Sequence, residues 1–126
     1  MSGLCGWINV PAEDGEALAT ADSMRRALRD RDAEAPRPMI AVGCALAVEP
    51  GIRPVSLHQS DALLAAIEGR VRWRSSDLGA LARESGDAAA LAEAYRRHGT
   101  NCLQEISGPF AVAVVDTRHA GGLLAI

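Results

Sequence analysis

The sequence begins MSGLCGWINV (residues 1–10), and this stretch is expected to form the first strand of the fold. Because no leader precedes it, we expect the chain to remain in the cytoplasm. Ser2 is small enough to permit removal of Met1, which would place Ser2 at a free N-terminus. An α-amino group with a pKa of about 8 can act as general base for its own side chain. The opening therefore permits the form of covalent catalysis in which the N-terminal residue is the nucleophile.

Length and composition indicate one globular domain of 126 residues, with 48% hydrophobic and 23% charged residues. Aromatic residues make up only 3%, so the core must consist of Leu, Val, Ile and Ala. The net charge of −3 argues against nucleic acid or an anionic membrane as the main partner. No apolar run approaches the length of a membrane span.

The cysteine and histidine residues suggest neither a disulfide framework nor a metal site. The three cysteines form no CxxC pair and are expected to be buried or free thiols in a reducing compartment. The three histidines lie too far apart in sequence to indicate a cluster, and we expect no metal and no cofactor. These residues are Cys5, Cys44, Cys102, His58, His98 and His119.

An amphipathic helix is expected after the turn residues 11–15, because apolar side chains recur there at spacings of three and four. Its inner face would contain Leu18, Ala21, Met24 and Leu28, and its outer face Arg25, Arg26 and Arg29. Further helices are expected after Ser75-Ser76-Asp77 and after Asp87, whose side chains can act as N-caps. Gly99 is expected to end the second of these helices.

Strands are expected where apolar residues run continuously or alternate with polar ones. Residues 39–48 are predicted to form one strand covered on both faces, and residues 63–67 a second that ends at Glu68-Gly69. Residues 55–57, 110–116 and 122–126 are predicted to be further strands. Val71 and Trp73 alternate with Arg70, Arg72 and Arg74, as in a half-exposed strand that presents three arginines to solvent or to an acidic partner. Strands and helices mix without βαβ alternation, so the fold class is α+β with antiparallel sheets between helices.

Several blocks of the sequence together resemble the class II glutamine amidotransferases, especially the glutaminase domain of the asparagine synthetase family. The opening MSGLCGW is similar to the family's Met-Cys-Gly-Ile-x-Gly, and His58-Gln59 resembles a His-Gln-Pro segment. Towards the C-terminus, LAEAYRRHG (residues 91–99), Cys102-Leu103, GPFAVAVVD (108–116) and LLA (123–125) follow the family's order and spacing. The resemblance implies the αββα four-layer sandwich of N-terminal-nucleophile hydrolases.

The resemblance also implies that residues 1–126 are a partial amidotransferase domain, because the sequence stops where the family continues into further strands. We expect the ATP-using synthetase domain of the family to be absent. We expect the sandwich to be incomplete at its C-terminal end, with exposed sheet edges that a partner chain or a second copy would cover. A homo-oligomer is therefore expected.

Carried over residue by residue, the family's site is altered at most of its positions. Ser2 stands where the family has its Cys nucleophile, and Glu68 replaces the Asn that donates to the oxyanion, while Gly69 retains its backbone N–H. Residues 43–47 contain no Arg to hold the substrate carboxylate. Asp87 falls where the family's Asp holds the α-amino group of a glutamine-like molecule.

Each of these residues also has a structural interpretation. Asp87 is a good helix N-cap, Gly69 could simply turn a strand, and Cys5 is expected to pack in the first strand. Cleavage after Leu4 would instead make Cys5 the terminal nucleophile, although the second glycine of the motif would then fall on Asn9.

Three functions remain open from the sequence. The first is a degenerate amidotransferase-like domain without glutaminase activity that serves as a scaffold or accessory domain for an ATP-dependent, amide-forming synthetase. The second is a working amidohydrolase that uses Ser2 on a substrate without a free carboxylate. The third is a small scaffold whose exposed sheet edges bind a protein partner.

Overall fold

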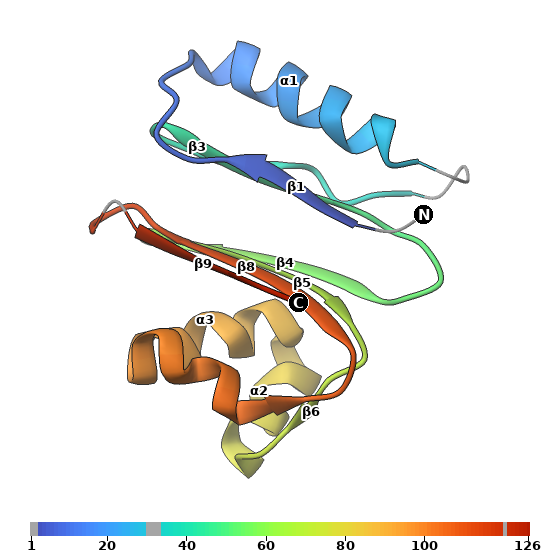
Figure 1. The fold of residues 1–126 in the computed structure, drawn as a ribbon, viewed down its shortest axis with the longest axis vertical. Coiled ribbons are helices and arrows are strands. Elements are labelled where there is room, and N and C mark those ends of the chain that lie inside the picture. Colours follow the sequence, from blue (N-terminus) through green and yellow to red (C-terminus); the bar gives the residue numbers. More distant parts are fainter. Residues whose placement is uncertain (1–2, 30–33, 120) are drawn as a thin grey trace.

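The computed structural model describes residues 3–29, 34–119 and 121–126, arranged in four layers (Figure 1). Helix α1 (Asp14–Ala27) covers a three-stranded sheet of order β1-β3-β2. A four-stranded sheet of order β4-β5-β8-β9 lies beneath it, and helix α3 (Asp87–His98) covers its other face, with helix α2 (Ser76–Ser85) packed against α3. The α+β class expected from the sequence is confirmed.

Every strand pair in both sheets is antiparallel. The strands of the upper sheet are β1 (Gly3–Trp7), β2 (Met39–Ala41) and β3 (Cys44–Glu49), and those of the lower sheet are β4 (Val55–Ser60), β5 (Leu63–Gly69), β8 (Phe110–Asp116) and β9 (Gly121–Ala125). A small two-stranded ribbon pairs β6 (Arg72–Trp73) with β7 (Ile106–Ser107), which follows the 3₁₀ helix η1 (Gly99–Glu105).

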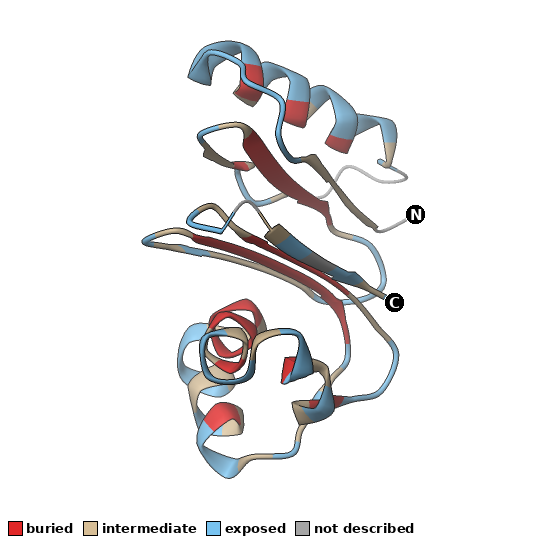
Figure 2. Cartoon of the chain, turned by 60° about the vertical axis from the view of Figure 1, so that its left-hand side comes forward, coloured by how far each residue is buried: buried red, intermediate tan, exposed pale blue. Residues whose placement is uncertain are grey.

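Strand β5 separates the two hydrophobic cores of the molecule. Leu63, Ala65 and Ile67 pack towards α3, whereas Leu64 and Ala66 pack towards the upper sheet. All seven residues of β5 are buried (Figure 2). This arrangement follows from the alternation of side chains along a strand, which lets a continuously apolar strand contribute to both of its faces.

The prediction of one strand over residues 39–48 is wrong, because the chain turns back within it. Strands β2 and β3 form a hairpin in which Ala41 pairs with Cys44. Gly43 adopts a φ of 72°, a left-handed conformation that glycine reaches without the steric cost of a Cβ atom. Val42, also in the turn, is 97% exposed.

The prediction that Arg25 lies on the outer face of the first helix is also wrong. Arg25 is buried, and its Nη1 donates a 2.6 Å hydrogen bond to Oε2 of Glu49, a fully buried residue at the end of β3. Arg29 reaches the other Glu49 oxygen at 3.2 Å, and Asp22 accepts bonds from Arg25 on the solvent side. Met24, which was expected to face inward, is instead exposed. A buried charge is tolerated only when it is paired, and Glu49 satisfies this condition for Arg25.

The remaining predicted elements are largely confirmed. The hairpin of β8 and β9 lies where two final strands were expected, Gly99 ends α3 with a φ of 58°, and Cys5 lies within β1. Val71 and Trp73 are half-buried beside three exposed arginines. Strand β4 extends three residues beyond the short strand predicted at 55–57. No helix in the part of the chain that the structure describes is long and apolar enough to cross a membrane.

Candidate functional site

The positions singled out by the sequence lie at two element ends. Glu68 and Gly69 are the last residues of β5, and Asp87 is the first residue of α3. Ser2, the candidate nucleophile, falls outside the described residues. In Figure 1, β5 ends on the side of the molecule where β1 begins.

The backbone N–H of Gly69, the candidate oxyanion donor, is already used within the fold. It donates a 2.9 Å hydrogen bond to the carbonyl oxygen of Pro54, in the loop that leads into β4. Gly69 has a φ of 130°, and a Cβ atom there would lie 2.2 Å from the carbonyl oxygen of Pro109. The glycine is therefore required by a close crossing of two backbone segments, which is the structural role that the sequence left open.

Glu68 lies on the face of β5 that points towards the upper sheet. It alternates in register with Leu64 and Ala66, and it pairs with Val55 on one side and Ala111 on the other. Only 7% of its surface is exposed. A carboxylate therefore occupies the inter-sheet layer at the position where the resemblance implies an amide donor.

Asp87 is held by an aromatic side chain from the neighbouring ribbon. Its Oδ1 accepts a 2.9 Å hydrogen bond from the indole Nε1 of Trp73. The expected N-cap role of Asp87 is wrong, because Gly86 occupies the N-cap position and α3 has no cap bond from its own side chains. Instead, Ser56 of β4 accepts a 3.2 Å bond from the backbone N–H of Ala88 at the start of this helix.

The structure therefore places Glu68 and Asp87 on opposite sides of β5. Glu68 faces the upper sheet, whereas Asp87 lines a polar pocket of about 480 Å³ in the helix layer. The other polar side chains around that pocket are Arg72, Ser75, Ser76 and Arg83. Ser75, whose hydroxyl donates to the Glu105 carboxylate, lies at the N-cap of α2 without capping it. Of the predicted site residues that the structure describes, Glu68 and Asp87 therefore do not face one common reacting centre.

Residues 43–47 supply no cation to the space between the sheets. The side chains of Cys44 and Leu46 pack into the inter-sheet core. Among the residues described in this half of the molecule, Arg25 is the buried cation, but it contacts Glu49 on the opposite face of β3, between the sheet and α1. Sequence reasoning missed this pair, because its members are 24 residues apart.

Cys5 lies in the middle of β1, paired with Ala47 of β3. Burial raises the pKa of its thiol, and this effect outweighs the opposing influence of the Arg25 guanidinium. A raised pKa disfavours the thiolate, which is the nucleophilic form of cysteine. The geometry therefore agrees with a packing role for Cys5.

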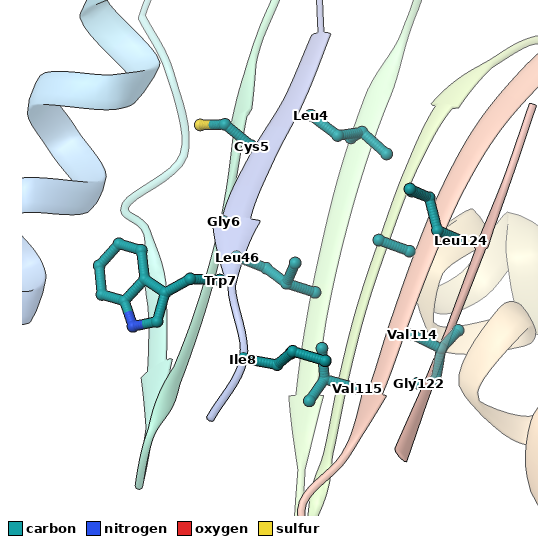
Figure 3. A pocket seen from close by; sticks show the side chains of 11 residues that line it. Leu4, Cys5, Gly6, Trp7, Ile8, Leu46, Val114, Val115, Gly122 and Leu124 are labelled. Carbon is teal, nitrogen blue, oxygen red and sulfur yellow. The ribbon is translucent and has the colours of Figure 1, made fainter. Parts of the chain in front are cut away.

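An apolar pocket between the sheets was not predicted. It has a volume of about 420 Å³ and opens between the edge strands β1 and β9 (Figure 3). Leu4 and Ile8 line it from β1 and the loop that follows, Leu46 from β3, and Val115 and Leu124 from β8 and β9. Its lining offers hydrophobic contact and no charged side chain.

Histidines and acidic residues show no metal-binding arrangement among the described residues. His119 pairs with Asp116 at 2.8 Å in the turn between β8 and β9, where Asp116 also accepts from the backbone N–H of Arg118. Both bonds stabilise the Asp116 carboxylate, whose pKa is lowered despite the opposing effect of its partial burial. This arrangement is typical of an Asx turn.

Comparison with known proteins found no match of the chain to a family model, a curated protein or a solved structure.

Proposed function

We propose that this chain is a class II amidotransferase-like domain of the N-terminal-nucleophile type that has lost glutaminase chemistry and serves as an accessory domain. The resemblance in the sequence motivates the family. The order of layers, helix–sheet–sheet–helices with antiparallel strands, is what that family would require. The proposed partner is an ATP-dependent, amide-forming synthetase.

One observation supports the loss of chemistry most directly: the Gly69 N–H donates to the Pro54 carbonyl at 2.9 Å. An oxyanion hole requires donors that point at the developing negative charge, and removing one such donor typically lowers the rate by about 10²–10³-fold. The buried carboxylate of Glu68 beside this position would oppose an oxyanion further. Asp87, the position for the substrate ammonium, is bonded to Trp73 on the other side of β5.

The test is a coupled assay of ammonia release with millimolar glutamine, comparing the wild-type chain with Ser2→Ala. We expect equal background rates from the two proteins. Ammonia release by the wild type above the Ser2→Ala control would overturn the proposal. It would favour the amidohydrolase that uses Ser2.

A further inference from the structure

The two sheets end unevenly on the side where β1 and β9 are edge strands. β1 lies over β5 and β8, so β9 extends beyond it. The inner face of β9 is consequently uncovered. Leu124 is 76% exposed, although Ala113, its partner on β8, belongs to the inter-sheet core.

Both edge strands lack two of the features that normally prevent unwanted pairing, namely charged residues and prolines. The sequences GLCGW of β1 and GGLLA of β9 contain no charged residue and no proline. Among the described strands, β1 pairs with β3 alone and β9 with β8 alone. Natural edge strands usually carry charges, prolines or bulges, because an unpaired row of N–H and C=O groups is a template for another strand.

The shape of this side is complementary to itself. In Figure 1, β1 runs from the N-terminus towards the left, whereas β9 runs to the right and ends at the C-terminus. A half-turn about an axis parallel to the strands and midway between the sheets keeps strand directions but exchanges the upper and lower sheets. It would bring β9 of a second copy beside β1, antiparallel to it, in the space above the first copy's β9.

We propose that two copies of this chain form a dimer in which β9 of each copy pairs with β1 of the other. The three-stranded sheet of one copy then continues into the four-stranded sheet of its partner, and the same occurs on the other side of the axis. Each apolar pocket is filled by the inner face of the partner's β9. The Leu124 side chains of the two copies meet near the axis.

A second copy fits this surface better than an unrelated strand. An unrelated strand could pair with β1 or with β9, but it would leave the other edge open. The two-fold arrangement pairs both edges at once and uses the same patch on both copies, which closes the assembly. It also requires no opposing charges, and neither strand carries any.

The experiment measures molar mass in solution by light scattering after size exclusion, for the wild type, Leu124→Asp and Val42→Asp. Leu124 and Val42 are both exposed apolar residues, at 76% and 97%, so neither substitution buries a charge in the single chain. We expect the wild type and Val42→Asp at twice the 13.2 kDa chain mass and Leu124→Asp at the chain mass. A monomeric wild type, or a Leu124→Asp protein that remains dimeric, would overturn the proposal.

If Leu124→Asp fails to fold, hydrogen exchange of the wild type decides the question. The amides of β1 and β9 should be protected at high protein concentration and should exchange faster on dilution, while those of β5 remain protected. Exchange in β1 and β9 that does not change with concentration would contradict the dimer.

Discussion

At the scale of single residues, a polar side chain that the sequence assigns to the candidate site is hydrogen-bonded within the fold. Trp73 and Asp87 illustrate this, since the indole N–H of Trp73 is the hydrogen-bond donor that holds the carboxylate of Asp87. Trp73→Phe should remove that donor, so that the half-buried carboxylate of Asp87 loses this hydrogen bond. The free energy of unfolding should fall by about 1–3 kcal/mol. Asp87→Asn is the matched control, because an amide oxygen still accepts the bond and the loss should be smaller. Urea unfolding of both variants checks the prediction, and equal losses would contradict it.

Two glycines allow a second comparison at this scale. Gly69→Ala should be strongly destabilising, because its Cβ would overlap the Pro109 carbonyl. Gly15→Ala should stabilise by about 0.5–1 kcal/mol, since Gly15 lies within α1 and no atom surrounds its added Cβ. Thermal unfolding of the two variants measures the difference. A Gly69→Ala protein as stable as the wild type would show that this backbone crossing can relax.

At the scale of elements, α1 is fastened to its sheet by the buried pair of Arg25 and Glu49. Arg25→Met would remove the shorter of the two contacts to Glu49 and leave this buried carboxylate with Arg29 at 3.2 Å, so it should lower the free energy of unfolding by about 1–3 kcal/mol. Arg26→Met is the control, because Arg26 forms an ion pair only 2.6 Å long with Asp22 but is 68% exposed, and such pairs contribute about 0–1 kcal/mol. Urea unfolding should separate the two variants. Similar losses would mean that the pair does not hold the helix.

Helices α2 and α3 are joined by Arg97, which pairs with Asp77 of α2 and with Glu93 of its own helix. Arg97 lowers the pKa of both carboxyls below their ordinary values of 3.8 and 4.5. The stabilisation is therefore complete above those values and is lost as the pH falls through the depressed pKa values. Arg97→Gln should reduce stability at pH 7 and flatten its decline below about pH 4, whereas the exposed Arg74→Gln should not. Circular dichroism followed from pH 7 to acid checks this, and an unchanged acid profile would contradict it.

The elements show how far sequence patterns reach. Apolar runs located β5 and β8 correctly, because a strand buried on both faces needs few polar residues. The same rule wrongly predicted β2 and β3 as one strand, because Val42 and Gly43 continue the apolar run in the sequence. Only the positive φ of Gly43 in the structure reveals the turn. Periodicity placed Arg25 outside because a helix pattern does not include Glu49, a partner from a distant strand. Likewise, the hydrogen bond from Gly69 to Pro54 depends on tertiary contact and leaves no local signal.

At the scale of the whole molecule, the described residues form four layers with one open side, and Glu68 and Asp87 do not share one polar site. Glu68 faces the upper sheet, Asp87 lies in the helix layer, and the pocket between the sheets is apolar. Such a molecule has surfaces suited to binding a partner but no described cluster of side chains suited to catalysis. This is why we interpret it as an accessory domain.

The most direct test of that interpretation restores the nucleophile and asks whether chemistry returns. Nucleophile and oxyanion hole act as a unit, so replacing one does not recover the activity of both. Ammonia release from millimolar glutamine should be measured for Ser2→Cys against Ser2→Ala, after intact mass has shown that Met1 is removed from each. We predict the same background rate for the two variants. Turnover by Ser2→Cys above that background would show that the hydrogen bonds of Gly69 to Pro54 and of Asp87 to Trp73 do not prevent catalysis. That result would contradict the central claim.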